Sequence, residues 1–515
     1  MRNKTPSFIA EFELNTDTAM VSTLSVRFEA ARQVYNACLG ESLRRWERVK
    51  ESQAYKLAKS MPRTKDGKPN KERGKAFGEA RKPFAFSEYD LHSYAVQFGK
   101  SWLGDHLDAN TIQKIASRAF STVNMYAIGK RGKPRFKGKN RPMKSVEGKS
   151  NKQGVRFSDN NILWSGLVLP LIVDESDPVH QHALSHRVKY VRLLWREIFG
   201  RKRFFAQLVC EGLPYRKPKN VVTDGVVGLD IGPSTVAIVS DEQADLKRFA
   251  DEIGDKAKEI AKLQRDIDRQ KRDGNPDNYA PDKWVKNANG NWKHKKGKNK
   301  KGKQKWVASK RQQRTQAKLR EAHRKLAAHR KSLHGKLANE ILAQGTTIKT
   351  EKISYKAFQS MFGKSVGKRA PGMFVEMLRR KAANAGGEVI EFSTHKTRLS
   401  QTCHRCGTIQ KKSLSERWHI CDCGVTAQRD LYSAFLAACV EDDRLVAPLA
   451  NSLWESRLPL LQTAASRTKS VIGQACLSNV APLARQNGSS VDSKNQSKVG
   501  LHDQRALSVL GTPCL

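Results

Sequence analysis

The chain has 515 residues, and its 95 Lys and Arg against 50 Asp and Glu give a formal net charge of +45. A charge surplus of this size favours nucleic acid as the partner, because binding releases the counterions that surround a polyanion. No apolar run approaches the roughly eighteen residues of a membrane-spanning helix, and the N-terminal sequence lacks the apolar core of a signal peptide. We therefore expect a cytoplasmic protein that binds nucleic acid and no membrane.

The first 213 residues contain both strand and helix patterns. Apolar residues alternate over 5–14 as in a strand, and they recur at helical spacing over 17–50 and again over 109–127. The polar stretch 60–82 is expected to be an exposed loop. Short apolar runs predict that residues 153–213 are rich in β-strands.

A short apolar hairpin is expected next, over residues 225–240. Two buried-strand patterns are broken there by Gly232 and Pro233, and one carboxylate, Asp230, lies near the tip. A charge buried at this position must be compensated, and a bound metal ion is one form of compensation.

Two long helices follow, at 253–271 and 310–344, and apolar residues on one side of each predict an antiparallel pair. The tract between them, 285–305, is rich in Gly, Asn and Lys, and it is expected to be mobile because it cannot form a core. A solvated basic loop is the commoner role of such a tract, and a clamp on a nucleic-acid backbone is the alternative.

Four more elements are expected: a strand at 346–351, a helix at 371–385, a strand at 388–392 and a helix at 430–440. Glu351 ends the first of them, and Asp430 lies in the first turn of the last. Beyond about residue 450 the periodicity fades and Ser, Asn, Gln and Ala dominate. Residues 451–515 are therefore expected to form a largely disordered tail.

Four cysteines precede the last of these helices with the spacing C-x2-C-x14-C-x-C: Cys403, Cys406, Cys421 and Cys423. Two close pairs can place four thiolates at tetrahedral positions around one zinc ion, and the other cysteines are scattered singly, as is typical of a reducing compartment. We expect a structural zinc site without an open position for catalysis. Disulfides or incidental thiols are the alternative, and His404 or His419 could replace one thiol.

Three carboxylates stand out: Asp230, Glu351 and Asp430. Brought together, they could hold two magnesium ions about 4 Å apart, which activate water and stabilise the leaving oxygen of a phosphodiester. Each acid alone is more often a turn or cap residue. Their combination with a zinc site in so basic a chain predicts a metal-dependent nuclease.

These residues resemble the motifs of TnpB, the RNA-guided DNA nuclease of bacterial insertion sequences, and of the compact type V CRISPR effectors that share its RuvC domain. The resemblance covers about residues 5–440. The matching segments are Ala30–Asn36, Lys133–Lys137, Val227–Gly232, Thr350–Ile353, Leu399–Gly407, and Cys423 with Arg429 and Asp430. In the third RuvC motif, Tyr432 stands where the family usually has Asn.

The resemblance implies a multidomain α+β fold. A β-barrel wedge domain with an inserted helical recognition domain would be followed by an RNase H-like (RuvC) α/β nuclease domain with an inserted zinc ribbon. The implied boundaries are 1–16 and 129–220 for the wedge, 17–128 for the recognition domain, 221–395 and 425–450 for the RuvC domain, 396–424 for the target nucleic-acid-binding zinc ribbon, and 451–515 for the tail.

The resemblance also implies roles for individual residues. It makes Asp230, Glu351 and Asp430 the catalytic, magnesium-binding residues, and it makes the four cysteines the ligands of structural zinc. The implied nucleic-acid contacts are Arg32, Tyr35, Asn36, Arg135, Phe136, Lys137 and Arg429.

The implied activity is cleavage of double-stranded DNA beside a short flanking motif, with the target chosen by pairing to a guide RNA. Guide RNA and double-stranded DNA are thus the implied partners, and two Mg²⁺ ions and one Zn²⁺ are the implied metals. A monomeric ribonucleoprotein is expected, in the cytoplasm of a bacterium or archaeon and associated with its nucleoid.

Three alternatives stay open. A type V CRISPR effector would use the same chemistry, and only the neighbouring genes would separate it from a transposon-encoded nuclease. A nuclease-inactive, RNA-guided DNA-binding repressor is kept open by Tyr432. Residues 226–235 also resemble the phosphate loop of ATPases and kinases with RNase H-like architecture, but such proteins are seldom this basic and do not carry a four-cysteine ribbon.

Overall fold

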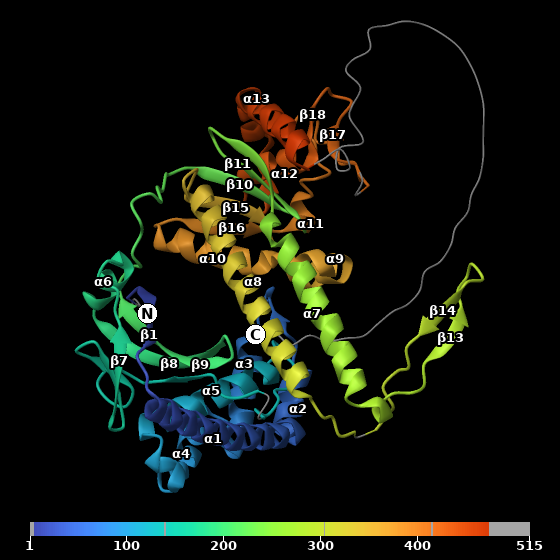
Figure 1. Ribbon diagram of the computed structural model, residues 1–515. Helices are drawn as coiled ribbons and strands as arrows, with labels where there is room; N and C mark the ends of the chain where they lie inside the picture. Colours follow the sequence, from blue (N-terminus) through green and yellow to red (C-terminus); the bar gives the residue numbers. More distant parts are fainter. Residues whose placement is uncertain (1–4, 139–140, 303, 414–415, 473–515) are drawn as a thin grey trace, which may run out of the picture.

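The computed structural model describes residues 5–138, 141–302, 304–413 and 416–472. The described chain forms a mixed α/β, multidomain structure (Figure 1). One hydrophobic core is built from residues within the sequence range Phe8 to Cys210. Two further cores are built from residues within the sequence range Val227 to Ala465. The mixed α/β, multidomain character expected from the sequence is confirmed.

A seven-stranded antiparallel sheet, in the order β4-β8-β9-β1-β7-β6-β5, organises the N-terminal part. Its strands are β1 (Ser7–Leu14), β4 (Ser145–Glu147), β5 (Arg156–Ser158), β6 (Asn161–Trp164), β7 (Leu167–Ile172), β8 (Val188–Ile198) and β9 (Arg201–Glu211). The predicted strand at the start of the chain is β1, and it lies in the middle of the sheet. Helix α6 (Pro178–Leu184) packs against it.

A helical insertion separates β1 from the rest of this sheet. It consists of α1 (Thr18–Glu51), α2 (Gln53–Ser60), α3 (Lys71–Arg81), α4 (Glu88–Gly99) and α5 (Ala109–Ala127), with the short helices η1 (Lys82–Phe84) and η2 (Trp102–Asp105). The predicted helices at 17–50 and 109–127 are α1 and α5, and they pack against each other. The prediction of a loop at 60–82 was wrong, because a small hairpin of β2 (Thr64–Lys65) and β3 (Lys68–Pro69) leads into α3. The Asn70 side chain caps α3 by accepting from two backbone N–H groups.

A buried arginine joins the helical insertion to the sheet. Arg27 of α1 donates to the carbonyl oxygens of Trp164 and Ser165, and its guanidinium lies 5.0 Å from the centroid of the Trp164 ring. The Trp164 indole donates to Asp108, the N-cap of α5, at 3.0 Å. Helix and sheet are therefore tied by charge-assisted hydrogen bonds inside one core.

A five-stranded mixed sheet, in the order β12-β11-β10-β15-β16, organises the C-terminal part. Its strands are β10 (Val226–Ile231), β11 (Thr235–Val239), β12 (Ala244–Arg248), β15 (Thr347–Glu351) and β16 (Glu388–Phe392). Strands β10, β15 and β16 run parallel, and β10, β11 and β12 are successive antiparallel neighbours. The predicted hairpin around Asp230 is the β10–β11 pair.

Helices cover both faces of this sheet (Figure 1). The helices and small hairpins of the C-terminal part include η3 (Asp251–Ile253), α7 (Gly254–Asp273), α8 (Lys310–Leu342), α9 (Tyr355–Arg369), α10 (Pro371–Asn384), α11 (Thr394–Thr397), β17 (Trp418–Ile420), β18 (Thr426–Gln428), α12 (Arg429–Ala438), β19 (Val440–Glu441), β20 (Arg444–Leu445) and α13 (Ala447–Ile472). Val227, Leu229 and Ile231 of β10 pack toward α8 and α10. Gly228 therefore faces the opposite side, where α12 packs, and strand alternation places Asp230 on that side too.

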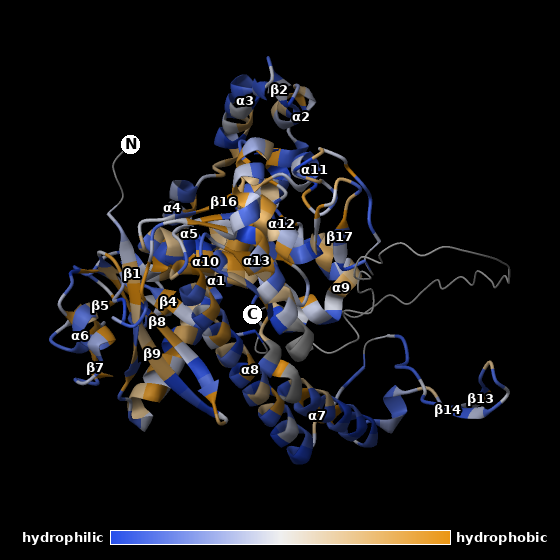
Figure 2. Ribbon diagram, turned by 90° about the horizontal axis from the view of Figure 1, so that it is seen from above, coloured by the Kyte–Doolittle hydropathy of each residue, from blue (hydrophilic) through white to orange (hydrophobic). Residues whose placement is uncertain are grey.

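The predicted antiparallel pair of long helices is confirmed as α7 and α8. The tract between them contains η4 (Pro276–Asn278) and a hairpin of β13 (Lys283–Lys286) and β14 (Trp292–Lys295). The mobility expected for this tract stays a prediction. Figure 2 shows hydrophobic residues in the two large sheets, and hydrophilic residues along α7 and at the hairpin. In the described ranges, no helix is both long enough and apolar enough to cross a bilayer.

The predicted tail is helical where the structure describes it. Residues 451–472 belong to α13, and residues 473–515 lie outside the described ranges. Trp454, Leu461 and Ala465 of α13 are buried in the core that also contains α12. The prediction of disorder was therefore wrong for residues 451–472. Their apolar residues recur at helical spacing, but the abundant Ser, Asn and Gln around them obscure that pattern.

Candidate active site and zinc ribbon

The three predicted catalytic carboxylates come from three different elements on one side of the sheet. Asp230 lies at the carboxyl end of β10, and Glu351 is the last residue of its parallel neighbour β15. Asp430 is in the first turn of α12, the helix that packs on this face. Carboxyl ends of parallel strands form the edge of a sheet at which ligands commonly bind.

The charges of Asp430 and Glu351 both act on Asp230, so both carboxylates lie near it. Burial, the charge of Asp430 and the charge of Glu351, in that order, raise the pKa of Asp230 well above its ordinary value, and Arg429 opposes the shift. Burial raises the pKa of Glu351 to about 7, against a backbone hydrogen bond at Leu399. Like charges shift each other's pKa in this way only at short range. The structure therefore brings together all three predicted acids.

The carboxylates are nevertheless spaced more widely than a closed metal cage. Within the described ranges, one group of three or more potential metal ligands has all its ligand atoms within 4.8 Å of one another, and that group is the four cysteines. Asp430 is also drawn toward two cations, because Arg429 Nε lies 3.5 Å and Arg417 Nη1 3.8 Å from its oxygens. Carboxylate oxygens are the donors that Mg²⁺ prefers, and a divalent cation would relieve the mutual repulsion of the acids. The residues present therefore fit magnesium.

Two residues that the sequence analysis did not single out position α12. A Cβ on Gly228 would lie 1.9 Å from the carbonyl oxygen of Ala434, so only glycine allows the helix to approach β10 this closely. Lys349 of β15 donates from Nζ to the carbonyl oxygen of Ala438 at 3.0 Å, at the negative end of the helix dipole. A glycine inside a strand pattern is a signal of close backbone approach, and it could have identified Gly228.

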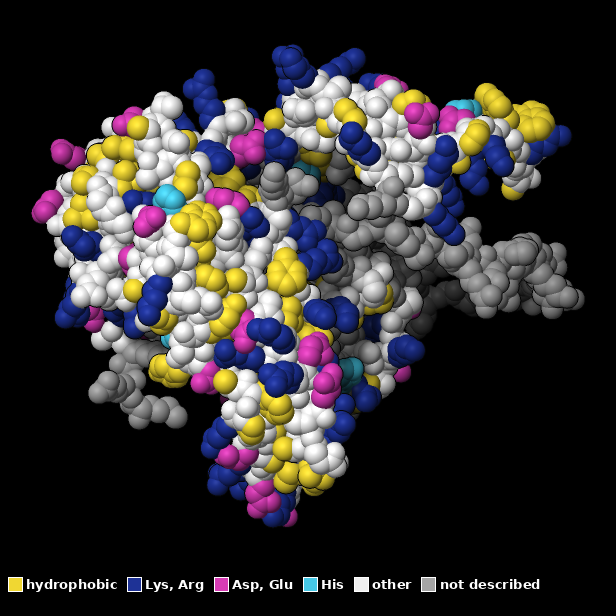
Figure 3. All heavy atoms as spheres, turned by 90° about the horizontal axis from the view of Figure 1, so that it is seen from below, with side chains coloured by type: hydrophobic (Ala, Val, Ile, Leu, Met, Phe, Trp, Pro, Cys, Tyr) yellow, Lys and Arg dark blue, Asp and Glu magenta, His cyan; other side chains and the backbone are white. Residues whose placement is uncertain are grey.

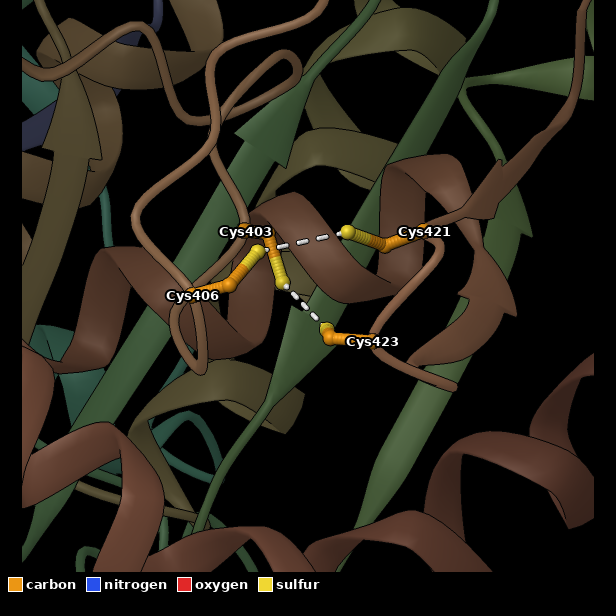
Figure 4. Close-up of side chains that lie close together, drawn as sticks. All are labelled: Cys403, Cys406, Cys421 and Cys423. Atoms are coloured by element: carbon orange, nitrogen blue, oxygen red, sulfur yellow. Dashed lines mark hydrogen bonds between the residues drawn. The ribbon is translucent and has the colours of Figure 1, made fainter.

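The four cysteines form a second site beside α12 (Figure 4). The sulfur atoms of Cys403 and Cys423 lie 3.5 Å apart, and those of Cys406 and Cys421 lie 3.4 Å apart. Tetrahedral zinc with Zn–S bonds of about 2.3 Å places its sulfurs about 3.8 Å apart. The four thiols therefore fit zinc, and the short C-x-C pair converges as well as the longer pair does.

Each cysteine pair is held by a tight turn that ends in glycine. Gly407 N donates to the Cys403 carbonyl and Gly424 N to that of Cys421, and the glycines have φ of 72° and 90°. Side chains other than glycine rarely adopt this left-handed conformation. Hydrogen bonding with the side chain and backbone of Thr408 lowers the pKa of Cys406 to about 6, which favours the thiolate that zinc binds.

Tyr432, the departure from the family motif, connects α12 to the cysteines. Its side chain is fully buried, and its hydroxyl oxygen accepts from the backbone N–H of His404 at 3.0 Å and lies 2.7 Å from Nδ1 of the same histidine. Its ring lies 4.3 Å from that of His419. Burial lowers the pKa of both histidines to about 4, so both are neutral. Tyr432 therefore has a structural role, and neither histidine belongs to the metal-ligating group.

Six of the seven predicted nucleic-acid contacts form one cluster, in which α1 holds the basic segment 133–137. The side-chain amide of Asn36 donates to the carbonyl of Lys137 and accepts from its N–H, both at 2.8 Å. Arg32 donates to the same carbonyl at 2.7 Å, and the Lys137 ammonium lies 5.2 Å from the centroid of the Tyr35 ring. Arg32, Tyr35 and Asn36 thus each contact Lys137 and so anchor the segment.

The other three predicted contacts are differently placed. Arg135 and Phe136 are exposed at the surface of the anchored segment, and the Phe136 side chain is 55% exposed. Arg429 lies away from this cluster, beside Asp430, and donates to the Ser413 carbonyl at 2.9 Å. The structure thus separates residues that hold the segment from residues that it presents to solvent.

Comparison with protein families identifies the part of the chain that contains the cysteines and Asp430. Residues 372–436 match the family model described as the Cas12f1-like TNB domain. This part of the chain is therefore similar to a Cas12f1-like TNB domain. This match confirms the resemblance to TnpB-like and compact type V effectors.

Two solved structures are similar at low identity. One is a cryo-EM structure of the Cas12f1–sgRNA–target DNA complex, at 11% identity over 84% of this chain and 98% of that chain, with a TM-score of 0.40. The other is a cryo-EM structure of a CRISPR–Cas12f ternary complex, at 12% identity over 81% of each chain, with a TM-score of 0.27. TM-scores this low do not establish a common arrangement, so these similarities add nothing to the functional argument. No curated protein matches the sequence.

Proposed function

We propose that this chain is an RNA-guided DNA endonuclease of the TnpB and compact type V kind, which hydrolyses double-stranded DNA beside a short flanking motif. The observation that carries the proposal is the effect of the Asp430 and Glu351 charges on Asp230, at one edge of a sheet. The Cas12f1-like TNB domain, which contains Asp430, and the net charge of +45 support it.

In this proposal Asp230, Glu351 and Asp430 hold Mg²⁺, which supplies activation of water and stabilisation of the leaving oxygen. The residues themselves contribute rigidity, because two carboxylates are carried by paired strands and the third by a packed helix. Arg429 lowers the cost of gathering three negative charges and offers a cation near the anionic backbone.

The proposed domains follow the observed elements. The seven-stranded sheet is the wedge (1–16 and 129–220), and β5 lies against β8 as expected when a sheet curls toward a barrel. Helices α1 to α5 are the recognition domain (17–128). The five-stranded sheet with its helices is the RuvC domain (221–395 and from 425), interrupted by the zinc ribbon (396–424). Because α13 packs on α12, we extend the RuvC domain beyond residue 450 to 472.

We further propose that Arg135 and Phe136 contact nucleic acid, while Arg32, Tyr35, Asn36 and Lys137 hold them in place. An exposed aromatic ring beside an exposed guanidinium suits a base and a phosphate. The Lys and Arg surplus would hold guide RNA and target through their backbones, and pairing with the guide would select the target sequence outside the flanking motif.

Cleavage by the purified ribonucleoprotein tests the proposal. Asp230→Asn, Glu351→Gln and Asp430→Asn should each bind guide RNA and a matched plasmid normally, but should cut it about a hundredfold more slowly or worse in Mg²⁺. Glu388→Gln, an exposed carboxylate on the adjacent strand β16, should cut at the normal rate. Binding of the matched plasmid without any nicking by the unaltered protein would favour the repressor alternative. The contacts of Tyr432 with His404 give it a structural role, so its presence does not by itself favour that alternative.

Metal analysis tests the zinc assignment. The protein should contain one zinc per chain, and Cys406→Ser or Cys421→Ser should lower this content. Cys439→Ala, a buried cysteine outside the set, should keep the metal. Protein that is purified without chelators and contains no zinc would refute the assignment.

A further inference from the structure

The segment 274–309 between α7 and α8, here termed the arm, leaves the body from an ordered base. The Asn275 side chain accepts from Val307 N at 2.7 Å and donates to the Val307 carbonyl at 2.8 Å. Arg272 donates to the Gly297 carbonyl at 3.0 Å, and the Lys271 ammonium lies 3.8 Å from the centroid of the Trp306 ring. These contacts fix both strands of the arm where it begins, and the β13–β14 hairpin projects beyond them (Figure 1).

The pairing register gives the hairpin two chemically different faces. Trp284 is opposite His294, and Lys286 is opposite Trp292. Because side chains alternate along a strand, these four share one face. The other face carries the remaining paired residues, namely Lys283, Val285, Lys293 and Lys295. One face is therefore aromatic and the opposite face is cationic.

Nothing in the described chain covers the aromatic face. The side chains of Trp284 and Trp292 are 63% and 64% exposed. Their contacts are local, because the Trp284 and His294 ring centroids lie 5.1 Å apart and the Lys286 ammonium lies 5.3 Å from the centroid of the Trp292 ring. The end of the arm, at the upper right of Figure 3, shows hydrophobic side chains beside Lys and Arg. Large rings left in water on a projecting element mark a binding surface.

Charge selects the kind of partner. Residues 283–306 contain ten lysines and no acidic residue. Asp282, directly before them, is already engaged by the Gly297 N–H at 2.7 Å and by His294 at 3.2 Å. Lysines bind phosphates, and exposed indole rings stack on unpaired bases, which a closed duplex does not present. An acidic peptide would satisfy the lysines but would leave the two indole faces without planar partners.

We infer that the arm binds single-stranded nucleic acid. Trp284 and Trp292 stack on successive unpaired bases, and the lysines of the opposite face and of the returning strand contact the phosphates. This assignment goes beyond the proposed cleavage and does not depend on the three carboxylates.

Binding of labelled oligonucleotides to the full-length chain tests the inference. The probes are fluorescein-labelled single-stranded RNA and single-stranded DNA of about 16 nucleotides, and a duplex of the same DNA. Trp284→Ala with Trp292→Ala should weaken single-strand binding about fivefold or more, because each stacking contact contributes substantially. A triple variant, in which Lys283, Lys293 and Lys295 are all changed to Gln, should reduce the magnitude of the slope of log affinity against log salt by about 2. The matched control is Trp102→Ala, an indole that is 55% exposed far from the arm in sequence.

Zero-length photocrosslinking locates the contact. Oligonucleotides with 4-thiouridine or 4-thiothymidine should crosslink to peptides from residues 283–306. Loss of binding to RNA alone or to DNA alone in the tryptophan variant would identify the natural strand. Unchanged single-strand affinity without crosslinks in the arm would overturn the inference, and so would an equal loss of duplex binding. None of these measurements requires cleavage, so a failure of the proposed nuclease activity would be a separate result.

Discussion

The absence of a side chain at Gly228 determines how close α12 lies to β10, and hence how close Asp430 lies to Asp230. A Cβ at this position would meet the Ala434 carbonyl at 1.9 Å and the Ala438 nitrogen at 2.7 Å, and both are backbone atoms of a packed helix. Such atoms cannot rotate away as the end of a flexible side chain can. The geometry of the candidate site therefore depends on a residue that has no chemistry of its own.

Gly228→Ala should displace α12, abolish cleavage and lower the free energy of unfolding by about 1–3 kcal/mol, the usual effect of overpacking. The measurements are plasmid cleavage and denaturant unfolding. Gly363→Ala in α9, where the new methyl group would meet nothing within 4 Å, should leave both unchanged or slightly improve stability. Full activity of Gly228→Ala would show that close packing of α12 is not required.

Glu351 makes stability depend on pH. Burial raises its pKa to about 7 in the folded protein, whereas an unfolded carboxyl group titrates near 4.3. Between these values the unfolded chain releases its proton first, so stability falls as pH rises from about 4.3 to about 7 and stays lower above that. The candidate site thus costs stability at neutral pH when no cation compensates its charge.

At about pH 8 without divalent ions, Glu351→Gln should therefore unfold at a higher temperature than the unaltered protein. The free energy of unfolding should be about 1–3 kcal/mol larger. The difference should vanish at about pH 4, where the carboxyl group is protonated in both states. Thermal unfolding in a chelator at the two pH values is the measurement, with Glu388→Gln as the exposed control. An equal effect at both pH values would contradict the electrostatic explanation.

At the scale of elements, the contact between α12 and the cysteine turn depends on one hydroxyl group. Tyr432→Phe would keep the aromatic packing with His419 and Trp454 but would leave the backbone N–H of His404 buried without a partner. We expect a loss of about 1–2 kcal/mol of stability and faster release of zinc to a colorimetric chelator. Tyr89→Phe, at a residue that is 82% exposed, should change neither. Unchanged zinc release in Tyr432→Phe would mean that the hydroxyl does not support the ribbon.

Helix α13 is part of the C-terminal core and covers β12 and α12. Trp454→Ala would open a cavity beside Phe435 and His404, whose ring centroids lie 5.6 and 4.7 Å from that of Trp454. We expect destabilisation of about 3 kcal/mol or more in denaturant unfolding. Asn451→Ala, an exposed position on the same helix, should have no effect. Equal stability of the two variants would contradict the role of α13 in the core and would favour the expectation of a disordered tail.

At the scale of the whole molecule, the charge of +45 opposes compactness unless anions neutralise it. Raising salt from about 50 to about 200 mM should therefore increase the melting temperature of the RNA-free protein. Added single-stranded RNA should raise it further, and more at the lower salt concentration, because binding to the folded state stabilises it and salt weakens that binding. Thermal shift assays over this range make the comparison. A melting temperature that is insensitive to both salt and RNA would show that self-repulsion is unimportant.

Features encoded by nearby residues could be predicted from the sequence alone. Apolar periodicity identified α1, α5, α7, α8 and β1, because burial of one face imposes a spacing on the chain itself. The cysteine spacing predicted four converging thiols, because each pair is closed by a local glycine turn. The order of the acidic motifs predicted the convergence of Asp230, Glu351 and Asp430, because each lies at a recognisable end of a strand or helix.

Other features depend on residues far away in the chain, and only the tertiary structure decided them. Asn36 and Arg32 are residue types that often contact nucleic acid, but their side chains bind the Lys137 backbone, which lies about a hundred residues later. Trp454 holds α13 in place because its side chain is buried in the core that α12 also forms. The sequence by itself determined which residues carry charge, sulfur and periodicity. The tertiary structure decided which of them contact one another and which face solvent, because hydrogen bonds and burial depend on proximity in space, which sequence spacing beyond a few turns does not specify.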